Sequence, residues 1–122
     1  MPTILYIDDS PTNRRLVERI VWLRGHLTLL ETSTGKEGLE IARRQPPDLI
    51  LLDLKLPDLQ GDQILAALKA DPTTRPIPVV IVTAERERKN FQHLHMLGAF
   101  DCLTKPLNVA RLLTLLDEVV PA

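Results

Sequence analysis

The stretch Asp48-Leu49-Ile50-Leu51-Leu52-Asp53 decides the predicted fold of this chain. Its four central residues are aliphatic without a break, so a strand formed by them would be buried on both faces. Such a strand is typical of the middle of a parallel sheet, where helices cover each side. The stretch ends in a carboxylate, Asp53, at the point where the strand would leave the core.

Three other apolar runs of the chain also end in polar residues. In chain order these residues are Asp8 and Asp9 after the run 4–7, Thr83 after the run 79–82, and Lys105 after the run 100–104. In a parallel sheet, residues just past the carboxyl ends of the strands gather in one crevice. We therefore expect three carboxylates, one hydroxyl and one ammonium group to converge. This set suits a divalent cation and a phosphoryl group.

Strands and helices are predicted to alternate along the whole chain. We expect strands at 3–7, 27–30, 48–53, 78–82 and 100–104, and helices from Pro11 to about Gly25 and at 34–44, 62–70, 85–97 and 108–119. Ser10 and Thr34 are good N-caps for the first two helices. Five strands alternating with five helices predict an α/β doubly wound parallel sheet with helices on both faces. Alternation alone does not fix the strand order.

Length and composition are those of one soluble domain. The chain has 122 residues, of which 44% are hydrophobic and 25% charged, as in ordinary globular proteins. The net charge of -1 gives no support for nucleic-acid binding. The single cysteine, Cys102, excludes an internal disulfide and fits a reducing compartment. We see no signal peptide and no apolar run near the roughly 20 residues of a membrane span, so the expected location is the cytoplasm.

The acidic residues favour a metal and a phosphoryl group over simpler roles. Asp8 and Asp9 would repel each other and Asp53, which raises carboxylate pKa values unless a cation compensates. They would otherwise only cap the first helix, but Ser10 already fills that role. Asp53 would otherwise only turn the chain, but an aspartate can also accept a phosphoryl group. Lys105 precedes Pro106, and this bond is a candidate cis peptide.

Taken together, these residues resemble the receiver domain of two-component response regulators over the whole chain. The matching residues are Asp8-Asp9, the stretch from Asp53 to Gly61, Thr83-Ala84, Gly98-Ala99 and Lys105-Pro106. The resemblance implies a CheY-like, flavodoxin-like fold with five helices and a five-stranded parallel sheet in the order 2-1-3-4-5. It implies a single receiver domain over residues 1–122 without an output domain, either free-standing or part of a longer protein.

The resemblance also implies a role for each site residue. Asp53 would be the phosphoacceptor, charged by a phosphohistidine on a histidine kinase or a histidine phosphotransfer protein. Thr83 and Lys105 would bind the phosphoryl oxygens. The implied cofactor is Mg2+, held by Asp9, by Asp53, by the backbone carbonyl of Lys55, and by Asp8 mainly through metal-bound water. The domain would assist its own phosphorylation and dephosphorylation, but would act in signalling rather than as an enzyme.

The implied output surface comprises the helix 85–97, the strand 100–104 and the helix 108–119. Phosphorylation would remodel it through Thr83, for a downstream protein partner or for a phosphorylation-dependent homodimer. Three residues before the lysine, where the family usually has Tyr or Phe, this chain has Cys102. Phe100 would then serve as an apolar anchor for a partner, or would pack on the edge of the helix. Lys55 and Glu85 would flank the mouth of the site as an ion pair or as two solvated side chains.

Other functional classes fit the sequence less well. A haloacid-dehalogenase-type phosphatase needs a second aspartate two residues after Asp53, where this chain has Lys55. A flavodoxin needs a phosphate loop rich in Ser, Thr and Gly after the first strand, and the acidic Asp8-Asp9 would repel phosphate. A receiver-like interaction module that is not phosphorylated stays an alternative. Such a module would normally lack one of the five groups, and none is missing here.

Overall fold

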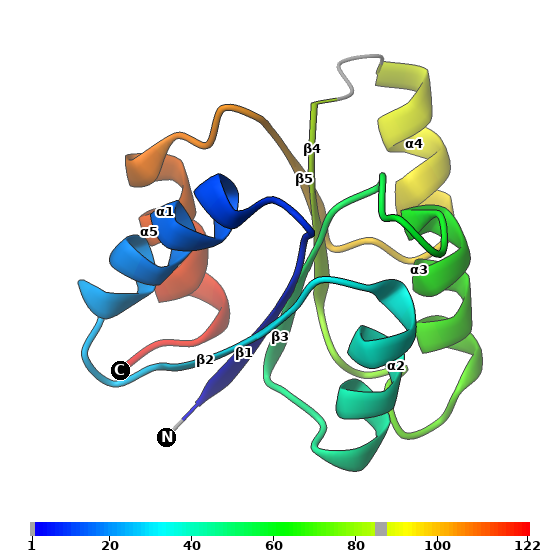
Figure 1. Cartoon of the computed structure of the whole chain (residues 1–122), viewed down its shortest axis with the longest axis horizontal. Helices are drawn as coiled ribbons and strands as arrows, with labels where there is room; N and C mark the ends of the chain where they lie inside the picture. Colours follow the sequence, from blue (N-terminus) through cyan, green and yellow to red (C-terminus); the bar gives the residue numbers. More distant parts are fainter. Residues whose placement is uncertain (1, 85–87) are drawn as a thin grey trace.

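The computed structural model describes residues 2–84 and 88–122, in which a parallel sheet lies between two layers of helices (Figure 1). In the described residues the strands are β1 (Thr3–Ile7), β2 (Thr28–Thr32), β3 (Leu49–Leu52), β4 (Val79–Thr83) and β5 (Asp101–Thr104), in the order β2-β1-β3-β4-β5. Helices α1 (Pro11–Trp22) and α5 (Val109–Val119) cover one face, and α2 (Gly35–Arg44), α3 (Gly61–Ala70) and α4 (Arg88–Met96) cover the other. The predicted doubly wound fold and strand order are confirmed.

β1 has its predicted bounds, the other four strands differ from theirs by one or two residues, and β2 and β4 run on through polar residues. β2 runs on to Thr32 because Glu31 and Thr32 pair with β1. β4 includes Thr83, which pairs with Thr104 of β5. An apolar pattern misses these residues because the pairing depends on the backbone and not on the side chain.

Two elements of the predicted output surface, β5 and α4, also have bounds that differ from the predicted ones. β5 begins at Asp101, so Phe100 precedes the strand, although its backbone N–H donates to the carbonyl of Val79 at 2.8 Å. The predicted helix 85–97 is observed as α4, from Arg88 to Met96, and residues 85–87 lie outside the described part of the chain. None of the helices in the described part has the length and apolar character that a membrane span requires.

Helices pack on both faces of the sheet, as the unbroken aliphatic run 49–52 predicted. All four residues of β3 are fully buried. Leu49 and Leu51 belong to a cluster with α1 and α5, whereas Ile50 and Leu52 belong to a cluster with α2, α3 and α4. Full burial of an aliphatic side chain of this size contributes about 1.5–3 kcal/mol. The central strands are therefore firmly held, and they fix the positions of the residues at their carboxyl ends.

A pair of carboxyl groups lies beside the edge strand β2. Glu31 of β2 pairs with Tyr6 of β1, and its side chain hydrogen-bonds that of Glu18 on α1. In the described part of the chain, no donor reaches the buried Oε1 atom of Glu31. Two carboxyl groups hydrogen-bond only if one carries a proton. Burial and Glu18 raise the pKa of Glu31 to about 7, although Arg14 of α1 opposes this shift.

This pair gives the first prediction, a pH-dependent stability that Glu31→Gln removes. Because the pKa of Glu31 rises from 4.5 to about 7 on folding, proton uptake stabilises the fold fully below the lower value, and this contribution is lost as the pH rises through the upper one. A glutamine is neutral throughout. In urea unfolding at a series of pH values, Glu31→Gln should therefore gain stability relative to the natural chain between these two pKa values. A difference that does not change with pH would refute the prediction.

Candidate functional site

The carboxyl ends of the central strands bring an acidic cluster together. Asp8 follows β1, Asp53 follows β3, and Asp9 adjoins Asp8. One oxygen from each of the three side chains lies within 4.8 Å of the others. Asp8 and Asp53 are buried and Asp9 is exposed. The backbone holds the two buried residues in place, because the N–H of Asp8 donates to Thr32 and that of Asp53 to Ile7.

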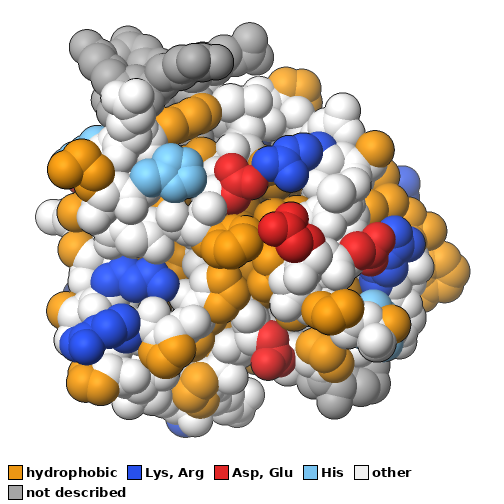
Figure 2. Space-filling model, turned by 180° about the vertical axis from the view of Figure 1, so that it is seen from behind, with side chains coloured by type: hydrophobic (Ala, Val, Ile, Leu, Met, Phe, Trp, Pro, Cys, Tyr) orange, Lys and Arg blue, Asp and Glu red, His pale blue; other side chains and the backbone are white. Residues whose placement is uncertain are grey.

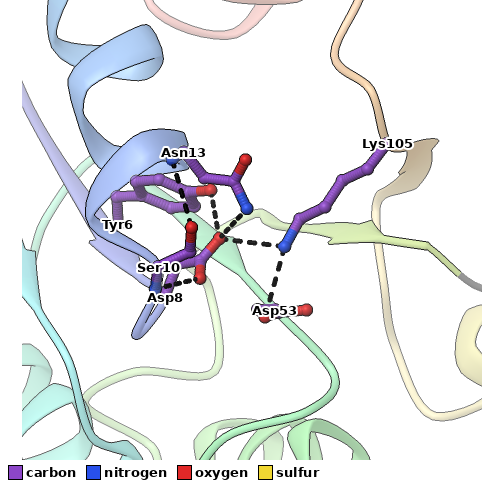
Figure 3. A network of polar contacts seen from close by, with 6 residues as sticks. All are labelled: Tyr6, Asp8, Ser10, Asn13, Asp53 and Lys105. Atoms are coloured by element: carbon purple, nitrogen blue, oxygen red, sulfur yellow. Dashed lines mark hydrogen bonds and ion pairs between the residues drawn. The ribbon is translucent and has the colours of Figure 1, made fainter.

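The ammonium group of Lys105 lies between the two buried carboxylates (Figure 3). Its Nζ atom is 3.0 Å from Oδ2 of Asp8 and 3.3 Å from Oδ2 of Asp53. The bond from Lys105 to Pro106 is cis, as predicted, and the Lys105 N–H donates to the carbonyl of Thr83 at 2.8 Å. The structure therefore brings the ammonium into the crevice with the carboxylates, where it pairs with Asp8 and Asp53.

Three further groups bind the Asp8 carboxylate, and the sequence analysis did not identify them. The hydroxyl of Tyr6 donates to Oδ2 at 2.5 Å, and the side-chain amide of Asn13 lies 3.4 Å from the same atom. The backbone N–H of Ser10 donates to Oδ1 at 2.9 Å. A period-two pattern could have indicated Tyr6, because residues two apart in an extended chain project to the same side.

The two buried carboxylates have pKa values shifted in opposite directions. Burial raises the pKa of both. For Asp8, the hydrogen bonds from Tyr6, Ser10 and Lys105 outweigh burial, so its pKa lies below the ordinary value. For Asp53, burial outweighs the attraction of Lys105, and the charge of Asp8 adds to it, so its pKa lies above the ordinary value. Of these two buried carboxylates, Asp53 is therefore the one whose charge the protein compensates less.

The loop after Asp53 is held by hydrogen bonds within itself and by hydrogen bonds to α2. Lys55 forms an antiparallel bridge with Gln60, and the N–H of Gly61 donates to the carbonyl of Leu54 at 2.7 Å. In the same loop, Asp58 accepts hydrogen bonds from the N–H groups of Gly35 and Lys36 at the start of α2, at 2.8 and 2.9 Å. These bonds connect the loop to a helix on the same side of the sheet, and they lower the pKa of Asp58.

Thr83 faces a pocket that borders this loop. The residue is buried at the last position of β4. The pocket has a volume of about 260 Å³ and is lined by Leu54, Lys55, Gln60, Asp62, Thr83, His93 and Leu94. Neither Asp62 nor His93 is expected there from the sequence, because nothing in the local pattern brings the start of α3 next to α4. The predicted contact of Lys55 involves Glu85, which lies outside the described residues.

The donor set fits a magnesium ion. Two buried carboxylates and one exposed carboxylate supply only oxygen atoms, and Mg2+ binds such hard ligands together with several waters. The exposed Asp9 leaves one side of the cluster open to water. A divalent cation would also offset the repulsion between Asp8 and Asp53. Asp8, Asp9 and Asp53 are therefore the side chains that would hold the ion, and the backbone of Lys55 contacts the Asp53 carboxylate from the loop.

Comparisons with known proteins agree on one family. The sequence model of the response regulator receiver domain matches residues 4–117. Protein PilH of Pseudomonas aeruginosa is 35% identical over 120 residues, which cover 98% of each chain. The chemotaxis protein CheY4 of Vibrio cholerae has a TM-score of 0.89 at 27% identity, covering 98% of this chain and 99% of that one. The receiver domain of the sensor histidine kinase PA1611 from Pseudomonas aeruginosa, with a magnesium ion in its active site cleft, has a TM-score of 0.88 at 26% identity, covering 99% and 98%.

The second prediction concerns the close approach of Gly61 to the loop after Asp53. A Cβ atom on Gly61 would lie 2.6 Å from the carbonyl oxygen of Asp53 and 2.6 Å from Cα of Leu54, so the backbone would have to move. Gly61→Ala should therefore destabilise the chain by about 1–3 kcal/mol in urea unfolding. Gly25→Ala is the matched control, since nothing lies within 4 Å of its Cβ position. Equal stability of the two variants would contradict the prediction.

Proposed function

Because this chain belongs to the response regulator receiver family, we propose that Asp53 is the residue that accepts the phosphoryl group. One observation carries the proposal: the Lys105 ammonium is shared by Asp8 and Asp53, with Asp9 completing a carboxylate cluster. The Lys105 ammonium and two further carboxylates, which would hold a metal ion in this proposal, thus surround Asp53. Of the two buried carboxylates, Asp53 also directly precedes the loop whose Leu54 and Lys55 line the pocket where a phosphodonor would arrive.

The proposed reaction is phosphoryl transfer from a phosphohistidine of a histidine kinase or a histidine phosphotransfer protein. A carboxylate oxygen of Asp53 forms a bond to phosphorus, while the bond from phosphorus to the imidazole nitrogen breaks and leaves its electron pair on that nitrogen. Bound Mg2+ would neutralise charge on the phosphoryl oxygens. Hydrolysis of the resulting acyl phosphate returns the Asp53 carboxylate and inorganic phosphate. The cycle serves signalling, so the domain is not proposed to be an enzyme with a separate substrate.

Thr83 and Lys105 are proposed to bind the transferred group. The Lys105 ammonium would move its ion pair from the carboxylates to the phosphoryl oxygens, which carry more negative charge. Thr83 lies at the end of β4, and its carbonyl already accepts the N–H of Lys105. Its hydroxyl would donate a hydrogen bond to the phosphoryl group. The two residues would thus respond to phosphorylation together.

The third prediction tests the acceptor itself. Acetyl phosphate and Mg2+ should add one phosphoryl group to the chain, seen as a mass increase in intact-protein mass spectrometry. Asp53→Asn should abolish the increase, because the amide is a poor nucleophile and its shape is otherwise retained. Asp58→Asn, in the same loop, is the control and should still be labelled. Labelling of Asp53→Asn to the level of the natural chain would refute the assignment.

The proposed output surface comprises α4, β5 and α5. Three of the five large hydrophobic residues exposed in the described chain belong to this region: Met96, Phe100 and Val109. On the side opposite to the view of Figure 1, hydrophobic side chains lie at the centre of the surface with charged groups beside them (Figure 2). Phe100 is 47% exposed, which favours the role of a partner contact over packing on the helix edge. Such a surface would serve a downstream protein or a phosphorylation-dependent homodimer.

The fourth prediction concerns transmission of the signal without an aromatic residue at position 102. Cys102 is half-buried and lies beside a groove of about 250 Å³ that Phe91, Pro106 and Leu107 also line. Phosphorylation should shift backbone NMR resonances of residues 96–104 and 109–119, because Thr83 is paired directly with β5. Thr83→Ala should still accept the phosphoryl group but lose most of these shifts. Shifts confined to the surroundings of Asp53 in the natural chain would contradict the proposed output surface.

We place the domain in the cytoplasm, where the free thiol of Cys102 would stay reduced. The small net charge of -1 favours protein partners over nucleic acid. The alternative of a receiver-like module that is not phosphorylated is disfavoured by the contacts of Lys105, which such a module would not need.

A further inference from the structure

We propose that Tyr6 is a positioning residue for magnesium binding, which acts by holding the Asp8 carboxylate through its hydroxyl group. The inference rests on the proposed function and deepens it, because it concerns how the acidic cluster is prepared for the metal. Tyr6 contacts neither the phosphoryl group nor, in this proposal, the ion. Figure 3 shows its hydroxyl directed at the Asp8 carboxylate from the side of α1, and Lys105 approaching from the other side.

The surroundings of Tyr6 give its hydroxyl a fixed position. The side chain is fully buried in the cluster between the sheet and α1 and α5, where Val17 and Leu112 are also fully buried. A buried aromatic ring has only two side-chain torsions, and close packing holds both. The hydroxyl therefore reaches Oδ2 of Asp8 from a rigid platform, and the distance of 2.5 Å is that of a strong bond to a carboxylate.

Of the three donors to Oδ2, Tyr6 is the one that the reaction would leave in place. Lys105 lies 3.0 Å from this oxygen, but the proposed function moves its ammonium to the phosphoryl group. Asn13 lies 3.4 Å away, near the limit of a hydrogen bond. Tyr6 is neutral, so it orients the carboxylate without adding a positive charge that would repel the metal. The other oxygen, Oδ1, is held by the backbone of Ser10.

Both oxygens of Asp8 thus have one firm anchor each before any metal arrives. Partners of this kind behind a metal-binding carboxylate typically change metal affinity by about 10–100-fold when they are removed. Without the hydroxyl, the carboxylate would turn towards Lys105, its strongest remaining donor at Oδ2. That rotation would change the positions that the Asp8 oxygens hold relative to Asp9 and Asp53, and the three carboxylates would no longer be prearranged for the ion. Removal of the Tyr6 hydroxyl should therefore weaken the affinity for Mg2+ but leave the phosphorylation rate of Asp53 at saturating Mg2+ unchanged.

The experiment compares Tyr6→Phe with the natural chain in two magnesium titrations. The first follows the Mg2+-induced rise in melting temperature without a phosphodonor, and the second follows phosphorylation of Asp53 by acetyl phosphate. In both titrations Tyr6→Phe should raise the half-saturating Mg2+ concentration by about tenfold. The maximal phosphorylation rate at saturating Mg2+ should stay close to that of the natural chain. Asn13→Ala should cause a smaller increase, because its bond to Oδ2 is longer.

Ile20→Val is the matched control, since it removes one methylene group from the core under α1 without touching Asp8. It should lower the melting temperature but leave the half-saturating Mg2+ concentration unchanged. If Tyr6→Phe behaves like this control, Tyr6 is only a core residue and the inference is overturned. If Tyr6→Phe is too unstable to titrate in buffer, both titrations are repeated in trimethylamine N-oxide, which favours the folded state, and an unchanged half-saturating Mg2+ concentration there overturns the inference. If the natural chain itself shows neither Mg2+ binding nor phosphorylation, the proposed function fails, which is a different result from the failure of Tyr6 alone.

Discussion

The repulsion between carboxylates at the end of the sheet is the constraint on which the rest of the structure depends. Three such groups lie within 4.8 Å, and two of them are buried. Buried charges of the same sign are tolerated only when donors and cations surround them. Around Asp8 the chain supplies a hydroxyl, an amide, a backbone N–H and an ammonium group. Around Asp53 it supplies less, and the remaining negative charge is what a metal ion and a phosphoryl group would use.

Holding this cluster requires a rigid frame, and the two packed faces of the sheet provide it. The central strands β1, β3 and β4 are almost entirely buried, so their carboxyl ends move little relative to one another. The loop after Asp53 is fixed separately, by the bond from Gly61 to Leu54 and by the contacts of Asp58 with α2. A preorganised site of this kind lowers the cost of arranging charges around the transferred group.

The connection from the site to the proposed output surface is short. Thr83 ends β4, pairs with Thr104 of β5, and accepts the N–H of Lys105 through its carbonyl. Cys102 lies on β5 beside a groove and offers no aromatic ring that could move into it. The backbone pairing between β4 and β5 therefore offers a route that does not depend on such a ring.

The sequence by itself determined the fold class and the members of the acidic site. Continuous aliphatic runs such as Leu49 to Leu52 indicate strands buried on both faces, and a polar residue at the end of each run indicates where the strands open to solvent. The supporting residues were decided only by the tertiary structure. Tyr6 looks like one more core residue in its strand, and Asp58 like an ordinary loop residue. The contacts of Asp58 form only because α2, which is distant in the sequence, packs beside the loop after β3. Tyr6 lies only two residues before Asp8, but the same position would suit any core residue, and the packing around the ring decides that its hydroxyl reaches the carboxylate.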